Sequence, residues 1–327
     1  MLDKKFVPQF NVTLRCNMYN ICKYCYVKEQ ASKFPLDLDC GDFANILDWF
    51  MELDVDEIIL LGGEPTLHPF FVQILETIGE RKLSARLFTN GTYNSSVSDL
   101  VSQNDCVETM FFHYDENYLK NSDKTMDKFV KNVEQAAASS KKIWLRWNVD
   151  RPDTDSSRVI ALAEKYSANI GYSISVPTPS SSQIPIAGVH EYAKSIVDLI
   201  SSASDKGIEI HPGRALPLCA FDEQQLELLK RLGSLEGTCI AINDLTVNTD
   251  LSLQLCSVSH SVNTGGVSGV KDLEEKIEFL KREESALRLQ PAISECNECE
   301  WFGNGECQGG CYGYKLFGKE QSNSSAS

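Results

Sequence analysis

Residues 6–25 read FVPQFNVTLRCNMYNICKYC, an apolar run followed at once by Cys16, Cys22 and Cys25. The run is typical of a β-strand, and the loop after it brings three thiolates toward one point. A closed zinc or iron-sulfur site uses four ligands. A structural zinc site would find its fourth ligand nearby, but the nearest histidine, His68, lies far along the chain. An iron-sulfur cluster held by three thiolates would instead leave one iron open to an outside molecule.

The composition is that of an acidic chain with room for a large core. At 327 residues and 42% hydrophobic, it can bury one α/β domain, alone or with a smaller partner. The N-terminus lacks the apolar stretch of a signal peptide and no window approaches a spanning helix, so we expect a cytoplasmic protein with no membrane partner. The net charge of -15 argues against nucleic acid as a partner. In a reducing cytosol the twelve cysteines stay free unless a metal holds them, and the isolated Cys40 and Cys106 are expected to be small buried hydrophobes.

Short β-rich runs alternate with segments of helical period from residue 6 to about residue 177. The predicted strands are residues 6–14, 56–62, 84–90, 107–115, 142–150 and 168–176. The predicted helices between them are residues 42–53, 70–82, 95–103, 125–140 and 156–167. This order predicts an α/β fold with parallel strands and right-handed crossovers, a partial (β/α)6 barrel that falls short of a full one.

The last third of the chain has little apolar periodicity. We predict short strands around residues 246–255, one charged helix over residues 271–287, and loops rich in glycine and cysteine. Such a region needs another source of stability, which metal-thiolate bonds can supply. We therefore expect a core domain over residues 1–206, a smaller cysteine-rich auxiliary domain over residues 207–318, and a disordered tail over residues 319–327.

Two motifs together resemble the radical S-adenosylmethionine (SAM) enzymes. The first is the three-cysteine loop with an aromatic residue, Tyr24, directly before its last cysteine, and the second is LLGGEPTLHP at residues 60–69. The resemblance implies that the three loop cysteines hold a [4Fe-4S] cluster whose open iron is chelated by SAM. It also implies that Gly62, Gly63 and Glu64 contact the methionine amino group. The residue types agree with this role, because glycines let a ligand approach the backbone and a carboxylate suits an ammonium group.

The cysteine loop departs from the spacing that is common in that family. The common pattern is Cys-x3-Cys-x2-Cys, whereas five residues separate Cys16 from Cys22 here. Two extra residues change the entropy of a loop only modestly, so we interpret the loop as a lengthened variant that still binds the cluster. The alternatives are a zinc site and a degenerate loop that binds nothing.

Two further strand ends supply candidate cofactor contacts. Thr89 and Asn90 follow the third predicted strand, where ligands bind in parallel sheets, and the family uses this position for ribose or carboxylate contacts. The sequence TNG is also an ordinary turn. Arg146 and Asn148 share one face of the fifth predicted strand, where a nucleoside or carboxylate would satisfy them if they point inward. An outward polar face is an equal alternative.

The stretch CNECEWFGNGECQGGC, residues 296–311, has the form Cys-x2-Cys-x7-Cys-x3-Cys. Read alone, it fits a zinc ribbon and an iron-sulfur site equally. In this chain it resembles the auxiliary-cluster region called SPASM, or its shorter twitch relative, although the family usually has x5 in place of x7. The resemblance implies two sets of ligands: Cys239, Cys256 and Cys311 with Cys219 as the most available fourth, and Cys296, Cys299 and Cys307. The family's usual last cysteine is absent, so the second set either leaves an iron open or holds no cluster.

The resemblance implies an enzyme that cleaves SAM reductively to a 5'-deoxyadenosyl radical, which removes hydrogen from a substrate. Proteins with this double arrangement often modify peptides, so we expect a peptide maturase that forms a cross-link or oxidises a side chain. A flavodoxin or ferredoxin would supply the low-potential electron. With no room for a leader-binding domain before the first strand, leader recognition would fall to another protein or to the body of this one. The alternatives are a dehydrogenase or epimerase for a small molecule, and a non-enzymatic zinc-ribbon adaptor.

Overall fold

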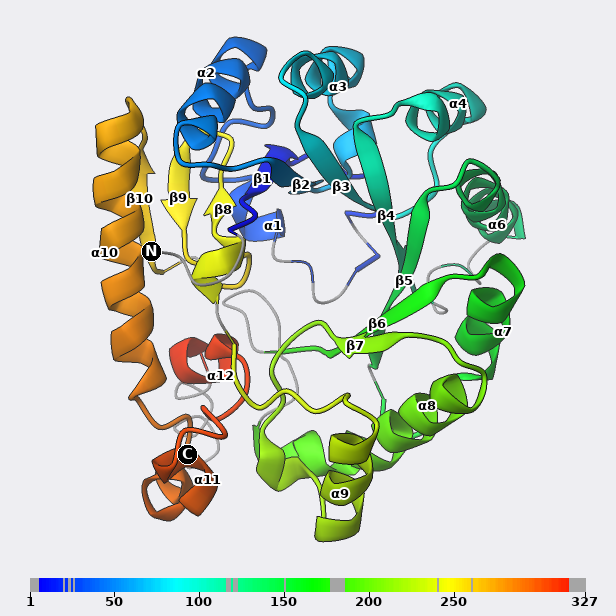
Figure 1. Cartoon of the computed structure of the whole chain (residues 1–327), viewed down its shortest axis with the longest axis vertical. Helices are drawn as coiled ribbons and strands as arrows, with labels where there is room; N and C mark the ends of the chain where they lie inside the picture. The colour runs from blue at the N-terminus through cyan, green and yellow to red at the C-terminus, as the bar shows by residue number, and fades with distance from the viewer. Residues whose placement is uncertain are drawn as a thin grey trace. The chain divides into compact units, whose positions relative to one another are not determined.

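The computed structural model describes most of the chain as two compact units, whose elements are labelled in Figure 1. The first unit comprises Met1–Ile143 and Ile240–Glu284, and the second comprises Trp144–Cys239 and Ser285–Ser327. The described residues are 6–19, 21–22, 25, 27–115, 119, 123–149, 151–176, 186–239, 241–259 and 261–317.

Parallel strands joined by helices form the first unit. Its first four strands are β1 (Gln9–Thr13), β2 (Glu57–Gly62), β3 (Ser84–Thr89) and β4 (Val107–Tyr114). Each pairs in parallel with the next. Five of the six residues of β2 are buried, which explains its unbroken apolar sequence, because a parallel strand covered by helices is buried on both faces.

Helices cover the outer side of these strands (Figure 1). They are α2 (Cys40–Met51), α3 (Phe71–Glu80), α4 (Ser95–Gln103) and α6 (Asp123–Ala138), and a short α1 (Val27–Gln30) follows the cysteine loop. Asp39 and Asn94 begin α2 and α4 with side chains that accept backbone N–H groups. Phe10 of β1 packs edge-on against Phe43 and Phe50 of α2, so an aromatic cluster joins the first strand to the first long helix.

A later segment of the chain returns to extend the first unit on the other side of β1. There β8 (Thr246–Val247) pairs in parallel with β1, and β9 (Ser252–Gln254) pairs antiparallel with β8. The predicted hairpin around residues 246–255 is therefore confirmed. β10 (Asn263–Gly266) pairs antiparallel with β9, and the charged helix α10 (Val270–Arg288) follows.

The second unit repeats the strand-helix order. Its parallel strands are β5 (Lys142–Val149), β6 (Asn169–Ile174) and β7 (Ile210–Pro212), paired in that order. Its helices are α7 (Ser157–Tyr166), α8 (Ala193–Asp205), α9 (Glu223–Arg231), α11 (Glu300–Gly303) and α12 (Tyr312–Phe317). Its short 3-10 segments include η2 (Ile186–Tyr192), η3 (Leu218–Ala220) and η5 (Ser294–Glu298).

The α/β fold with parallel pairing is as the sequence predicted. All six predicted strands and the five helices between them are present, each within a few residues of its predicted bounds. Two short strands lie past residue 206: β7 pairs with β6 in the second unit, and β8 pairs with β1 in the first. The predicted domain bounds at residues 206 and 318 stay a prediction. Strands of three and two residues are too short to produce a detectable period of two. The predicted tail, residues 319–327, lies outside the described residues.

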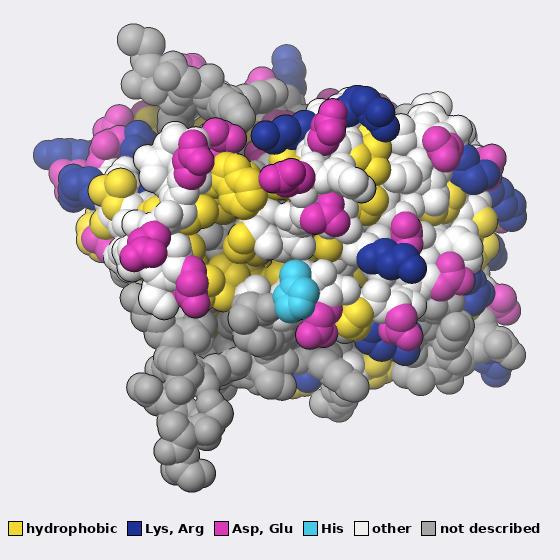
Figure 2. Space-filling model, turned by 90° about the horizontal axis from the view of Figure 1, so that it is seen from below, with side chains coloured by type: hydrophobic (Ala, Val, Ile, Leu, Met, Phe, Trp, Pro, Cys, Tyr) yellow, Lys and Arg dark blue, Asp and Glu magenta, His cyan; other side chains and the backbone are white. Residues whose placement is uncertain are grey.

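The two isolated cysteines differ in burial. Cys106 is buried as expected, whereas Cys40 is only half-buried at the start of α2. On the face shown in Figure 2, acidic and basic side chains are interspersed, so neither sign of charge dominates it. Over the parts of the chain that the structure describes, we find no helix with the length and apolar character needed to cross a membrane.

Candidate active site

Two glycines hold the segment before the first cysteine against the end of β2. The N–H of Gly63 donates to the carbonyl of Thr13 at 2.8 Å, and the N–H of Glu64 donates to the carbonyl of Arg15 at 2.7 Å. A Cβ on Gly62 would overlap the carbonyl oxygen of Thr13, and one on Gly63 would overlap that of Arg15. Gly62 also has a φ of 138°, which side-chain-bearing residues rarely adopt. The glycines therefore let the backbone that leads into the cysteine loop lie directly on residues 62–64, which we call the GGE segment.

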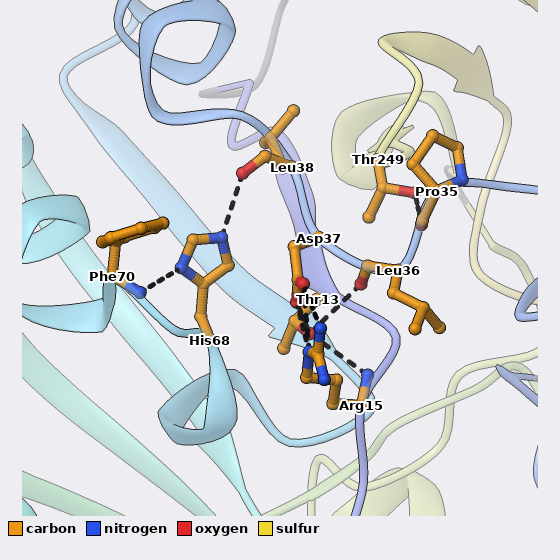
Figure 3. Close-up of polar contacts among 9 residues, drawn as sticks. All are labelled: Thr13, Arg15, Pro35, Leu36, Asp37, Leu38, His68, Phe70 and Thr249. Carbon is orange, nitrogen blue, oxygen red and sulfur yellow. Dashed lines mark hydrogen bonds and ion pairs between the residues drawn. The ribbon is translucent and has the colours of Figure 1, made fainter.

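An ion pair fixes the same segment from the side (Figure 3). The Arg15 guanidinium donates to both carboxylate oxygens of Asp37, with Nη2 2.8 Å from Oδ2, and the Thr13 hydroxyl donates to Oδ1 at 2.7 Å. Burial opposes the charge on Asp37, but the hydrogen bonds from Arg15 and Thr13 outweigh it and hold the pKa of the carboxyl below its ordinary value.

His68 has a structural role beside this ion pair (Figure 3). Its Nδ1 accepts from the N–H of Phe70 at 3.1 Å, so Nε2 carries the proton and donates to the carbonyl of Leu38 at 2.9 Å. The imidazole is 4% exposed and both of its nitrogens are engaged. A cavity of about 470 Å³ adjoins it, lined in part by Asp37, Cys40 and Phe70. Because His68 and Asp37 are already bonded within the protein, we assign this cavity no catalytic role.

Glu64 is a fully buried carboxylate at the end of β2. Its Oε1 accepts from the hydroxyls of Thr66 and Thr89, at 2.7 and 2.9 Å, and from the N–H of Thr66 at 3.3 Å. Its Oε2 accepts from the N–H of Asn90 at 2.7 Å. Burial raises the pKa of Glu64, and the hydrogen bonds from Asn90, Thr66 and Thr89 act in the opposite direction. The structure thus brings Glu64, Thr89 and Asn90 together from two strand ends.

A second network ties the cysteine loop to the turn after β3. The Asn90 amide donates to Oδ1 of Asn17 at 2.8 Å, and the Asn17 amide donates to the hydroxyl of Thr92 at 2.9 Å. The Thr92 hydroxyl in turn donates to Oδ1 of Asn90 at 2.6 Å. Asn17 belongs to the lengthened loop, and neither it nor Thr92 was predicted to belong to the site. Their pairing joins residues far apart in sequence, so only the polar character of the two turns could have pointed to it.

Cys16, Cys22 and Cys25 share one half-buried loop. Burial raises the pKa of the Cys16 thiol to about 11 and that of the Cys22 thiol to about 12, and the nearby Cys25 adds to both. The N–H of Met18 donates to Sγ of Cys16 at 3.3 Å. Hydrogen bonds to sulfur are one means by which a protein sets the potential of an iron-sulfur cluster. Tyr24 lies outside the described residues.

The donor set of this loop fits an iron-sulfur cluster better than a closed zinc site. Three thiols lie within electrostatic range of one another, while His68, the histidine nearest to them in the sequence, has both ring nitrogens bonded elsewhere. Among the residues that the structure describes, no three His, Cys, Asp or Glu side chains are already grouped around one metal position. Loading would therefore require the thiols to lose their protons and turn toward a common centre.

Arg146 lies across the strands of the second unit in space that two glycines leave. A Cβ on Gly171 would lie 2.7 Å from its Nη1, and one on Gly213 would overlap its Nη2. Nη2 is 3.4 Å from the hydroxyl of Ser173. Asn148, two residues further along β5, is half-buried. Because both residues belong to the second unit, their contact with a ligand of the first unit stays a prediction.

The cysteines of the auxiliary sets differ in burial. Cys296, Cys307 and Cys311 are buried, Cys239, Cys256 and Cys299 are half-buried, and Cys219 is exposed. A lysine that the sequence did not single out, Lys315, lies within electrostatic range of Cys296 and Cys307 and is 4% exposed. Burial lowers its pKa to about 8, and Cys296 and Cys307 act in the opposite direction. Its ammonium donates to the carbonyl of Leu287 at 2.8 Å, near the end of α10.

Comparison with known proteins identifies a family signature and a fold. Residues 10–163 match the family model of the radical SAM superfamily. The Fe-coproporphyrin III synthase of Methanosarcina barkeri is 30% identical over 90 residues, which are 28% of this chain and 22% of that protein. The mycofactocin maturase MftC of Mycobacterium ulcerans is 25% identical over 108 residues, 33% of this chain and 28% of that protein. The matched segments span less than a third of these relatives.

Among solved structures, the chain is similar to SuiB of Streptococcus suis. The crystal structure of SuiB with SAM has a TM-score of 0.67 at 13% identity, over 94% of this chain and 73% of SuiB. The structure of SuiB with its precursor peptide SuiA has the same TM-score at 14% identity, over 94% of this chain and 72% of SuiB. At this identity the similarity concerns the fold.

Proposed function

Because residues 10–163 match the family model of the radical SAM superfamily, we propose that this chain cleaves SAM reductively and uses the resulting 5'-deoxyadenosyl radical to remove hydrogen from a substrate. The observation that carries the proposal is the meeting of three predicted parts in the first unit. The cysteine loop lies on the GGE segment, Glu64 is buried beneath it, and Asn90 contacts both.

Cys16, Cys22 and Cys25 would hold the [4Fe-4S] cluster, which supplies the electron for breaking the sulfonium C–S bond when it is bound. The chain's own residues would position the cluster by holding the backbone around Cys16. The glycines of the GGE segment set the backbone before Cys16, and Asn17 anchors the residue after it to the turn that follows β3. Both anchors lie within two residues of the first ligand, so the first thiol is the best defined of the three.

Glu64 would receive the methionine ammonium of SAM. A carboxylate offers about four lone-pair positions over its two oxygens. Among the described residues, three donors bond to Oε1, whereas Oε2 accepts from the N–H of Asn90 alone. The ammonium therefore has a free position on Oε2, and its charge would favour the ionised carboxylate that burial disfavours.

For the substrate, we favour a peptide that the enzyme cross-links or oxidises on a side chain. The fold similarity to SuiB, which was crystallised with a precursor peptide, and the sequence similarity to the maturase MftC support this class. The similarity to a Fe-coproporphyrin III synthase favours a second candidate, a small-molecule dehydrogenase or epimerase. In either case a flavodoxin or ferredoxin in the cytoplasm would deliver the electron.

Anaerobic reconstitution with iron and sulfide tests the proposal. We expect a brown protein with about 8 to 12 irons that forms 5'-deoxyadenosine from SAM and dithionite. The C16A variant should form none, whereas C40A, which removes a thiol outside the cysteine loop, should match the wild type. Adding peptides encoded beside the gene should increase 5'-deoxyadenosine if the substrate is a peptide. A colourless protein that binds only zinc would support the zinc-ribbon adaptor instead.

A further inference from the structure

We propose that Cys219 is the fourth thiolate ligand of an auxiliary iron-sulfur cluster whose other ligands are Cys296, Cys299 and Cys307. The inference rests on the proposal that this chain holds iron-sulfur clusters, but not on cleavage of SAM. The sequence placed Cys219 with a different set and left these three cysteines one ligand short. All four cysteines belong to the second unit.

Two glycines bring the turn that carries Cys219 against the loop that carries Cys307. A Cβ on Gly237 would lie 2.5 Å from the carbonyl oxygen of Glu306 and 3.0 Å from Cδ2 of Leu218. The carbonyl of Gly237 also accepts from the N–H of Gln308 at 3.1 Å. Glu306 and Gln308, on either side of Cys307, therefore both contact Gly237, which also lies against Leu218.

The second glycine, Gly310, brings the loop that carries Cys307 against Pro217. A Cβ on Gly310 would lie 3.0 Å from Cδ of Pro217 and 3.1 Å from its nitrogen. Gly310 has a φ of 79°, so a larger residue there would be strained even without the contact. Pro217 and Leu218 directly precede Cys219, which lies in η3. Pro217 is close to Gly310, and Leu218 is close to Gly237, which also adjoins Glu306. Cys219 thus lies at the edge of this loop, and its side chain is exposed.

The other three cysteines form one folded segment. The N–H of Cys299 donates to the carbonyl of Cys296 at 3.3 Å, which closes η5. The N–H of Cys307 donates to the carbonyl of Trp301 at 2.9 Å, so the chain turns back on α11 between the second and third cysteines. The seven residues between Cys299 and Cys307 are therefore taken up by a helix and a turn, and the long spacing does not separate the ligands.

The electrostatics of the unit agree with this grouping. The Cys219 thiol lies within electrostatic range of Cys307, Cys296 and Cys299. The buried ammonium of Lys315 lies in range of Cys296 and Cys307 and would balance part of the charge of four thiolates. Its position is fixed by helix carbonyls and by the rings of Phe302 and Tyr312, at 5.5 and 5.6 Å.

Assigning Cys219 to the cluster of Cys296, Cys299 and Cys307 leaves the other set of auxiliary cysteines one ligand short. Cys239, Cys256 and Cys311 become the three cysteines without an assigned fourth thiol.

Iron counting in the full chain tests the grouping without measuring SAM cleavage. In a C16A/C22A/C25A background, only auxiliary iron remains. Adding C219A should remove about one to four irons, as a cluster loses either its unique iron or all of its metal, and the electron paramagnetic resonance spectrum should change accordingly. Adding C40A to the same background should change neither. An unchanged iron content in the C219A variant would overturn the proposal.

Pairwise combinations distinguish the two groupings. If Cys219 and Cys296 serve one cluster, C219A should remove no further cluster from a C296A variant, but should remove one from a C311A variant. The reverse pattern would assign Cys219 to the set predicted from sequence and overturn our grouping. A wild type that binds zinc at these thiols would also overturn it. A wild type with no iron anywhere would refute the proposed function as well.

Alkylation gives a readout that needs no variant. In the metal-free protein Cys219 is exposed and should react with iodoacetamide, as mass spectrometry of its peptide would show. After reconstitution, Cys219 should be protected together with Cys296, Cys299 and Cys307. Continued labelling of Cys219 while those three are protected would refute its role as a ligand.

Discussion

Replacing Gly63 with alanine should disrupt the cysteine loop from a position that binds no metal. The new Cβ would overlap the carbonyl oxygen of Arg15 and lie 2.7 Å from its carbonyl carbon, separations that real Cβ atoms essentially never show. The loop must move away from β2 to relieve this overlap. The two hydrogen bonds from the N–H groups of Gly63 and Glu64 would then be lost or lengthened.

The magnitude follows from those contacts. Two backbone hydrogen bonds contribute about 1–3 kcal/mol together, and an overlap against backbone costs about 1–3 kcal/mol more. We therefore expect G63A to lower the free energy of unfolding of the metal-free protein by about 2–6 kcal/mol, measured by urea titration. Because the segment leads directly into Cys16, the reconstituted variant should also lose about four irons and the formation of 5'-deoxyadenosine.

Gly79 provides the matched control in the same unit. It lies within α3, and a Cβ there would meet nothing within 4 Å. Alanine is favoured over glycine in a helix, so G79A should raise the free energy of unfolding by about 0.5–1 kcal/mol and leave the iron content unchanged. If G63A unfolds at the same urea concentration as the wild type and keeps its iron, the contact with Arg15 does not position the cysteine loop.

Three further predictions concern single side chains. E64Q should weaken SAM binding by about 10- to 100-fold in calorimetry, because a buried carboxylate that pairs with an ammonium contributes about 1.5–3 kcal/mol. K315M should lower the free energy of unfolding by about 1–3 kcal/mol in urea, because the carbonyl of Leu287 loses its buried donor. The pKa of Asp37 is held below its ordinary value in the folded state, so its contribution to stability is present above the unfolded-state pKa and is lost as the pH falls through the folded-state pKa. D37N should therefore unfold with less dependence on pH below about pH 4 than the wild type, as acid titration followed by circular dichroism would show.

The sequence predicted the repeating elements well because long periodic segments carry enough residues to show their period. β4 and β5, with eight residues each, were placed within a residue of their ends. β7 was missed because a strand of three residues shows no alternation, whereas β8 falls within the short strands predicted around residues 246–255. These short strands exist through pairing with β6 and β1, which is information that no local window contains.

The same limit applies to the candidate site. Thr89 and Asn90 could be singled out because they lie at the end of a recognisable strand, and Glu64 because it belongs to the GGE motif that the family resemblance supplied. Asn17 could not, because its role depends on meeting Asn90 and Thr92 across the fold. The position of Cys219 depends in the same way on contacts that glycines permit, and a cysteine pattern alone does not show them.

Anchoring also explains why unusual cysteine spacings need not abolish a site. Lengthening the first loop from three to five intervening residues costs about 0.5 kcal/mol in closure entropy. Each end of the loop is held by contacts of larger total energy: Asn17 bonds to the turn after β3, and the carbonyl of Cys22 accepts from the ammonium of Lys28 at 3.1 Å. Because the anchors outweigh the added entropy, the positions of the first two cysteines depend more on the residues that hold the loop ends than on the number of residues between them.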